Sequence, residues 1–115
     1  MNTAIVLLAP GFEEIEAITV IDLLRRAGIE VTIAGLVKGK VTGSHDISVM
    51  SNIYYRDADP DQYEMMILPG GQPGTNNLKK DPVILEWLAQ RYRKGKKIAA
   101  ICAAPSVLHE AGITT

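Results

Sequence analysis

The feature that most constrains this chain is a series of short, continuous apolar runs, each ended by proline or glycine. The first run, Thr3 to Ala9, reads TAIVLLA and stops at Pro10-Gly11. Apolar side chains at every position are typical of a strand buried on both faces, and such strands belong to parallel sheets covered by helices. The run has no basic flank and is too short to span a bilayer or to act as a secretory signal.

Strand and helix signals alternate along the rest of the chain. Apolar residues at near-helical spacing, with Gly28 as the stop, predict a helix over residues 13–27, and Asp81-Pro82 opens another that runs to residue 93. Further elements are expected as strands at 30–36, 63–68 and 97–101, a helix at 105–111 and a peripheral hairpin within 39–52. This order predicts one α/β domain over residues 1–115, flavodoxin-like and doubly wound, with a mainly parallel sheet and helices on both faces.

The charge balance and the cysteine count exclude several classes of protein. Twelve basic and thirteen acidic residues give a formal net charge of −1, and neither sign forms a long block. We therefore expect no nucleic acid and no membrane as a partner. A single cysteine cannot form an intramolecular disulfide, which agrees with a reducing compartment, and we expect a cytoplasmic protein.

The loops after the first, third and fourth parallel strands read PGFEEIE, PGGQPG and CAAP. In an open parallel sheet the ligand crevice lies beyond the carboxyl ends of the strands. If the strand order is 2-1-3-4, these three loops converge, and Glu16, Gly71 and Cys102 share one crevice. The substrate contacts expected in the same loops are Gly11, Gly70 and Ala103.

Cys102 lies where the last apolar run meets a helix that begins with proline. A thiol at the first turn of a helix faces unpaired N–H groups and the positive end of the helix dipole, and both favour the thiolate. This position makes Cys102 a candidate nucleophile. The alternative is a small buried apolar residue, which is the commoner fate of a free cysteine. The turn position alone leaves both interpretations open.

Three glutamates follow the first strand. Glu13 and Glu14 are expected only to complement the dipole at the start of the helix. Glu16 differs because it should face the crevice, where a carboxyl group could donate a hydrogen bond to a neighbouring sulfur atom.

Gly70 and Gly71 serve a tight turn in the simplest interpretation. In the functional interpretation, a backbone N–H there points at a developing oxyanion beside the thiolate. Together with Gly74 these glycines resemble a nucleotide-binding loop, but they follow the third strand, and the acidic first loop would repel a phosphate group. We therefore expect no nucleotide. A mechanism that uses the Cys102 thiolate needs no metal and no organic cofactor, so none is expected.

Four segments of the chain resemble the ThiJ/PfpI superfamily, in the branch of the parkinsonism-associated deglycase and its bacterial relatives. They read APGFEEIEAITVIDLLRRAG, VTGSHDISVMSN, MMILPGGQPGTNNL and IAAICAAP. The resemblance implies a flavodoxin-like sandwich of the class I glutamine amidotransferase type, usually a homodimer. It also implies a reactive cysteine at Cys102, a buried glutamate that shares a proton with it at Glu16, and an oxyanion-binding glycine at Gly71.

The chain departs from the family pattern in three ways. His45 replaces the arginine that close relatives have before Asp46 and that forms an interface salt bridge in the family, and CAAP replaces the CAGP of some members. The family also continues beyond this length, with a pocket histidine on a strand that would begin past Thr115. We therefore expect a domain truncated after its fourth parallel strand and the following helix. It is either paired with a complementary carboxyl-terminal polypeptide or a truncated product, and without such a partner it should associate with another copy of itself.

The first functional hypothesis is a cysteine-dependent enzyme of reactive carbonyls, a glutathione-independent glyoxalase or deglycase whose substrate is a small aldehyde or a glycated molecule. The alternative is a redox-sensing stress chaperone that uses oxidation of Cys102. A third hypothesis, a cysteine peptidase or amidohydrolase, needs a base beside the thiol. His109 would lie about 10 Å along the helix from Cys102, and His45 lies in the hairpin as a solvated or dimer-contact residue. The sequence therefore offers no cysteine–histidine pair.

Overall fold

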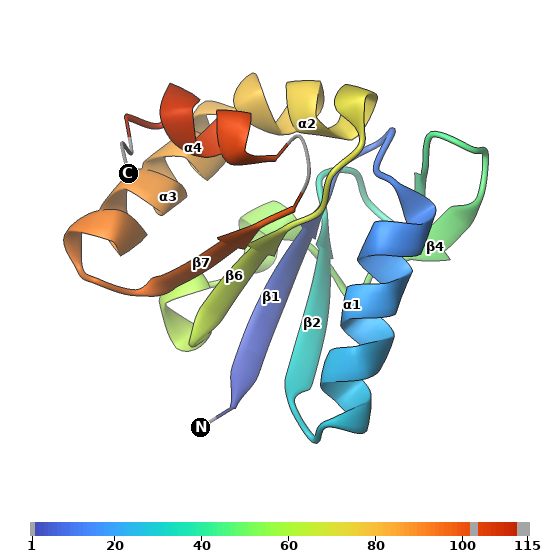
Figure 1. The fold of residues 1–115 in the computed structure, drawn as a ribbon, viewed down its shortest axis with the longest axis horizontal. Coiled ribbons are helices and arrows are strands. Elements are labelled where there is room, and N and C mark those ends of the chain that lie inside the picture. Colours follow the sequence, from blue (N-terminus) through green and yellow to red (C-terminus); the bar gives the residue numbers. More distant parts are fainter. Residues whose placement is uncertain (1, 102–103, 113–115) are drawn as a thin grey trace.

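The computed structural model describes residues 2–101 and 104–112 and has a five-stranded, all-parallel sheet at its centre (Figure 1). The strand order is β5-β2-β1-β6-β7, which contains the predicted order 2-1-3-4. The strands are β1 (Thr3–Leu8), β2 (Glu30–Gly35), β5 (Ile53–Tyr54), β6 (Met65–Leu68) and β7 (Lys97–Ala100). The predicted α/β fold with a mainly parallel sheet is therefore confirmed.

A separate antiparallel hairpin consists of β3 (Lys40–Thr42) and β4 (Ser48–Met50). It occupies the segment where the sequence predicts a peripheral hairpin. At its turn Asp46 adopts φ of +67°, a left-handed conformation that aspartate tolerates better than most residues.

The helices cover both faces of the sheet. α1 (Glu14–Arg26) lies on one face, beside the hairpin, and α2 (Gln72–Lys79), α3 (Pro82–Arg93) and α4 (Pro105–Glu110) lie on the other (Figure 1). Alternate residues of β1 point to opposite faces, as expected for a strand. Val6 packs in the cluster that includes Ala17 and Ile21 of α1, whereas Leu7 packs in the cluster that includes Leu88 of α3 and Val107 of α4.

A side chain at its start explains where α3 begins. The Asp81 carboxylate accepts hydrogen bonds from the N–H groups of Val83 and Ile84, and Pro82 occupies the first turn of α3. The other carboxylate oxygen of Asp81 accepts from the Tyr55 hydroxyl. This bond joins α3 to the 3-10 turn Tyr55–Asp57; a second 3-10 turn spans Pro60–Gln62.

Arg91 joins α3 to the amino-terminal side of the sheet. The residue is 1% exposed, and its guanidinium donates four hydrogen bonds of 2.9 to 3.1 Å to backbone carbonyls. The acceptors are the carbonyls of Pro60, Tyr63, Glu64 and Lys97. Burial lowers the pKa of Arg91. One buried side chain therefore holds the segment before β6 and the start of β7 against the helix.

Candidate functional site

The loops after β1 and β6 meet at one edge of the sheet, where β1, β6 and β7 end side by side. The Glu13 N–H donates to the Gly70 carbonyl at 3.0 Å, and the Ile101 N–H donates to the Leu68 carbonyl at 3.1 Å. The first bond joins the loop after β1 to the loop after β6, and the second joins the end of β7 to the end of β6. This carboxyl edge is where open parallel sheets bind ligands.

Glycine allows the loops after β1 and β6 to approach each other closely. Gly71 has φ of +99°, and a Cβ there would lie 2.6 Å from the Glu13 nitrogen and 2.9 Å from the Gly11 carbonyl oxygen. Gly11 has φ of +88°, and a Cβ there would collide with Pro73. Side chains at these two positions would push the loops apart. Among the described residues, none accepts a hydrogen bond from the Gly71 N–H.

The helix α2 holds the loop after β1 from the other side. The Gly74 N–H donates to the Gly11 carbonyl at 3.0 Å, and the Asn77 side-chain amide donates to the Pro10 carbonyl at 2.8 Å. Gly74 is buried, and a Cβ there would lie 2.9 Å from the Phe12 backbone. Residues 10–12 are therefore fixed in place by backbone and amide contacts before α1 begins.

Glu16 lies in the first turn of α1, and its Oε1 atom is buried. The turn that carries it is capped by Glu13, whose Oε1 accepts hydrogen bonds from the N–H groups of Ile15 at 2.6 Å and Glu16 at 3.2 Å. The prediction that Glu13 complements the start of the helix is confirmed, and it does so as the capping residue.

The prediction that Glu14 only complements the helix dipole is wrong. Glu14 is 3% exposed, and its carboxylate binds the turn of the hairpin. Oε2 accepts from the N–H groups of His45 at 2.7 Å and Ile47 at 3.2 Å, and Oε1 lies 3.0 Å from the His45 Nδ1. A Cβ at Gly43 would collide with the Glu14 carboxyl group, so a glycine is needed where the carboxylate meets the turn.

The contact between Glu14 and His45 shifts the ionisation of both groups. Burial alone would raise the pKa of Glu14, but hydrogen bonds from the His45 ring and from nearby backbone N–H groups outweigh it and lower the pKa to about 2. The hydrogen bond to Glu14 and the charge of Glu14 raise the pKa of His45 above its usual 6.5. The His45 side chain is 70% exposed, as expected of a solvated turn residue, yet it is also bound to α1.

Cys102 and Ala103 lie outside the described residues. Of their described neighbours, Ile101 follows β7, and Ala104 is buried at the start of α4. The Ala104 N–H donates to the Ile101 carbonyl at 3.0 Å. The residues on both sides of the pair therefore lie together at the carboxyl edge. His109 is in the last turn of α4 and is exposed.

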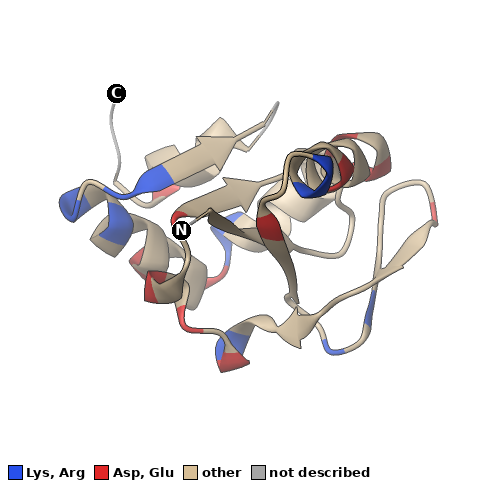
Figure 2. Cartoon of the chain, turned by 90° about the horizontal axis from the view of Figure 1, so that it is seen from below, with Lys and Arg blue, Asp and Glu red and all other residues tan. Residues whose placement is uncertain are grey.

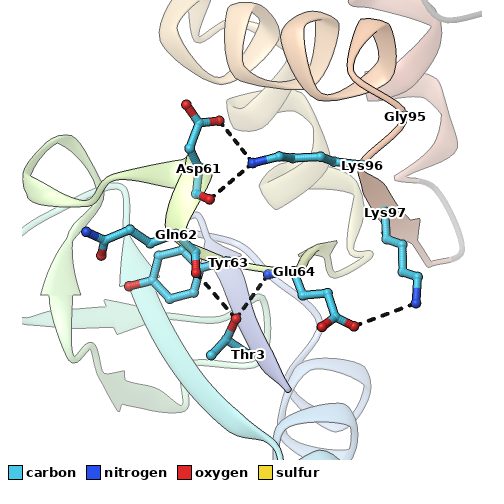
Figure 3. Close-up of a pocket in the computed structure, with 8 residues that line it drawn as sticks. All are labelled: Thr3, Asp61, Gln62, Tyr63, Glu64, Gly95, Lys96 and Lys97. Atoms are coloured by element: carbon cyan, nitrogen blue, oxygen red, sulfur yellow. Dashed lines mark hydrogen bonds and ion pairs between the residues drawn. The ribbon is translucent and has the colours of Figure 1, made fainter. Parts of the chain in front are cut away.

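A hollow of about 390 Å³ lies at the opposite end of the sheet (Figure 3). It is lined by Thr3 and Lys97, the first residues of β1 and β7, and by charged side chains that pair with one another. The Lys96 ammonium lies 3.5 Å from Asp61, and the Lys97 ammonium lies 3.7 Å from Glu64. None of the site residues predicted from the sequence lines this hollow, and its charges are already paired.

Other kinds of site find little support in the described part of the chain. Residues 2–101 and 104–112 contain no group of three histidine, cysteine, aspartate or glutamate side chains arranged to hold a metal ion. No helix within these ranges is both long and apolar enough to cross a membrane. Acidic and basic residues are interspersed along the same elements (Figure 2).

Comparison with known proteins shows similarity over nearly the whole chain. Residues 2–115 match the DJ-1/PfpI family. Protein dj-1beta of Drosophila melanogaster is 40% identical over 115 residues, which cover 99% of this chain and 62% of the fly protein. A deglycase of Thermococcus kodakarensis is 33% identical over 110 residues, which cover 95% of this chain and 65% of that protein. The chain therefore spans less than two thirds of the length of these relatives.

Solved structures show the same similarity in three dimensions. The crystal structure of Drosophila melanogaster DJ-1beta has a TM-score of 0.94 and 39% identity, and the match covers 98% of this chain and 61% of that one. Toxoplasma gondii DJ-1, in a structure described as oxidized, has a TM-score of 0.92 and 34% identity, and the match covers 98% of this chain and 62% of that one.

Proposed function

Because the chain belongs to the DJ-1/PfpI family, we propose that it carries the site of a cysteine-dependent enzyme that acts on reactive carbonyls, of the glutathione-independent glyoxalase or deglycase type. The observation that supports this proposal most is that the loop after β1, which leads into the turn of Glu16, contacts the loop that carries Gly71, next to the end of β7 at the carboxyl edge of the sheet. The similarity to a protein named as a deglycase agrees with it. The proposed substrate is a small aldehyde or a glycated molecule.

In this proposal the Cys102 thiolate is the nucleophile. It attacks the aldehyde carbon of a 2-oxoaldehyde, a carbon–sulfur bond forms, and the carbonyl electron pair moves to the oxygen. The oxygen then gains a proton, which gives a hemithioacetal. The Gly71 N–H donates to this oxygen while it carries negative charge. Gly11, Gly70 and Ala103 form the walls against which the substrate lies.

Glu16 is the proposed proton carrier. By moving protons between carbon and oxygen, its carboxyl group converts the hemithioacetal through an enediol into a thioester of a 2-hydroxy acid. This internal redox step needs no external oxidant and no cofactor. Water then hydrolyses the thioester and frees the thiol for the next turnover.

Turnover of methylglyoxal by the purified protein tests this proposal. Cys102→Ala should abolish turnover, and Glu16→Gln should lower kcat by about 10² to 10⁴, the usual contribution of general acid–base catalysis. Glu30→Gln, at an exposed position at the other end of the sheet, should leave kcat unchanged. Normal turnover by Glu16→Gln would show that Glu16 is only a charge at the helix end. Turnover by Cys102→Ala would show that Cys102 is not the nucleophile.

A redox-sensing chaperone is the second candidate, and the oxidized Toxoplasma gondii structure is the observation that favours it. Here peroxide oxidises the Cys102 thiolate to a sulfenic acid and then to a sulfinic acid, and the modified protein binds unfolded clients. The test is whether the protein suppresses client aggregation in a peroxide-dependent way. Loss of this effect in Cys102→Ala, with the effect kept in Glu16→Gln, would support the chaperone over the enzyme.

We also propose a homodimer that uses an apolar surface on α1 and the hairpin. On this surface, which we call the α1–hairpin face, Ile15 is 75% exposed, Ile18 42%, Ile47 53% and Met50 59%. Exposed aliphatic side chains gathered on neighbouring elements are typical of protein interfaces. The homodimer that the sequence resemblance implies agrees with the proposal.

A complementary carboxyl-terminal polypeptide is a further proposed partner. Within the described residues β7 pairs only with β6, so its other edge can accept a strand. We propose the cytoplasm as the compartment, because the mechanism requires Cys102 to stay reduced.

A further inference from the structure

Three contacts join the hairpin to the segment that leads into the proposed site. The Gly11 N–H donates to the Thr42 carbonyl at 2.9 Å, and the Ser44 N–H donates to the Phe12 carbonyl at 2.9 Å. These backbone bonds hold the end of β3 and the following turn next to residues 10–12. The third contact is the carboxylate of Glu14 with the backbone and ring of His45.

The third contact depends on a proton, whereas the backbone bonds do not. Glu14 is buried and ionised, so a protonated His45 ring forms an ion pair with it across 3.0 Å. A neutral ring keeps at most a hydrogen bond from Nδ1, and the hydroxyl of Ser44 competes for the same nitrogen at 3.2 Å. Loss of the proton therefore weakens one of the contacts between hairpin and helix.

The charged groups around the His45 ring come from two elements. From α1, Glu14 acts by contact and by charge, and Glu13 acts by charge alone. On the turn itself the next residue is Asp46, at a left-handed backbone position. All three are acidic, so the surroundings favour the protonated ring.

The segment fastened in this way continues directly into the site. Glu14 is in the same helical turn as Glu16, and the residue before it, Glu13, donates its N–H to the Gly70 carbonyl next to Gly71. A shift of the turn at Glu14 would thus move the carboxyl group of Glu16 relative to the Gly71 N–H.

We propose that Glu14 and His45 form a proton-operated latch between the hairpin and α1, and that the latch positions Glu16 in the site. This inference rests on the proposed function, since it assigns Glu16 a role there. Glu14 and His45 act as positioning residues and do not touch the substrate. The latch closes when His45 is protonated and loosens as the pH rises through its pKa.

An NMR titration of His45 tests the latch itself. The His45 midpoint should lie above the midpoint of the same residue in Glu14→Gln. Hydrogen exchange at the Ile47 amide, corrected for its intrinsic pH dependence, should become faster as His45 loses its proton. His45→Gln changes an exposed side chain and serves as the second variant if Glu14→Gln does not fold. It should remove the pH dependence of exchange at the Ile47 amide.

The alkylation of Cys102 by iodoacetamide tests the link to the site without any substrate. His45→Arg keeps a positive charge at this position at all pH values. The alkylation rate of the wild-type protein divided by the alkylation rate of His45→Arg should therefore fall as the pH rises through the His45 midpoint. A constant ratio would overturn the proposal, as would equal His45 midpoints in wild type and Glu14→Gln. If methylglyoxal is not turned over but these shifts are observed, the proposed function fails and the latch stands.

Discussion

Single residues at the carboxyl edge owe their conformations to segments far away in the sequence. Glu13 and Glu14 are adjacent acids in one helical turn, yet Glu13 caps α1 and Glu14 binds the hairpin. Helix propensity and dipole effects are the same for both, so the sequence predicts that both complement the helix start but does not distinguish the capping residue from the buried carboxylate. That difference arises only when the hairpin packs against α1, and Gly43 is the one local sign of it.

The first prediction concerns the close approach at Gly71. Gly71→Ala should destabilise the protein, because its φ is positive and the added Cβ would lie 2.6 Å from the Glu13 nitrogen. Gly95→Ala is a matched control, since Gly95 also has positive φ but no atom within 4 Å of the added Cβ. We expect about 1 kcal/mol for the control and at least about 1 kcal/mol more for Gly71 in urea unfolding. Equal losses would show that the two loops are not packed as described.

Among the elements, the strands were more predictable than the helix α2. Strands buried on both faces leave continuous apolar runs, so residues 3–8, 30–35, 65–68 and 97–100 could be recognised from the sequence. The segment QPGTNNLK of α2 has the small and polar composition of a loop. Gly74 lacks a side chain and is therefore able to lie buried against the loop after β1, and the neighbouring Thr75 is buried as well. The two-residue strand β5 is too short to show any periodicity.

The second prediction concerns Arg91 as the connection between α3 and the sheet. Arg91→Met should leave four backbone carbonyls without their donor, and a buried unsatisfied group costs about 1–3 kcal/mol. We expect a loss of at least about 3 kcal/mol of unfolding free energy. Arg93→Met is the control, because the Arg93 side chain is 65% exposed and meets only Glu86, at 3.8 Å, so it should change stability by less than about 0.5 kcal/mol. Similar effects of the two substitutions would contradict the structural role of Arg91.

The third prediction is the pH dependence of the contact between the hairpin and α1. The pKa of Glu14 is lowered, so its contribution to stability is lost as the pH falls from about 4.5 towards 2. The pKa of His45 is raised, so its contribution is complete below 6.5 and is lost as the pH rises through the folded-state value. The stability difference between wild type and His45→Gln should therefore be largest between about pH 4.5 and 6.5. Thermal unfolding measured at several pH values checks this, and a difference that grows above pH 7 would have the wrong sign.

For the molecule as a whole, the α1–hairpin face is distinguished by its exposed aliphatic side chains. The exposed aliphatic side chains of this face lie on elements that also build the proposed site, because Ile15 adjoins Glu16 and Ile47 donates to Glu14. The sequence predicted the amphipathic helix but could not show which of its apolar residues stay exposed. That depends on how the hairpin and the sheet divide the helix surface between them.

The fourth prediction is that association uses the α1–hairpin face. Ile47→Glu should shift sedimentation equilibrium of the purified protein towards the monomer, because a charge would be buried without a partner in the interface. Tyr92→Glu is the control, since Tyr92 is 50% exposed on α3, which covers the opposite face of the sheet. A wild-type monomer, or dissociation by Tyr92→Glu alone, would contradict the proposed interface.

We propose that Cys102 is a nucleophile, and the rate of alkylation of this single cysteine as a function of pH tests the proposal. A thiol at the start of a helix is stabilised as the thiolate by the helix dipole and by unpaired N–H groups, so we expect an inflection at a pH well below that of a free cysteine thiol. An inflection at or above the value of a free thiol would be evidence against the proposal and would indicate that Cys102 is a small apolar residue of the core.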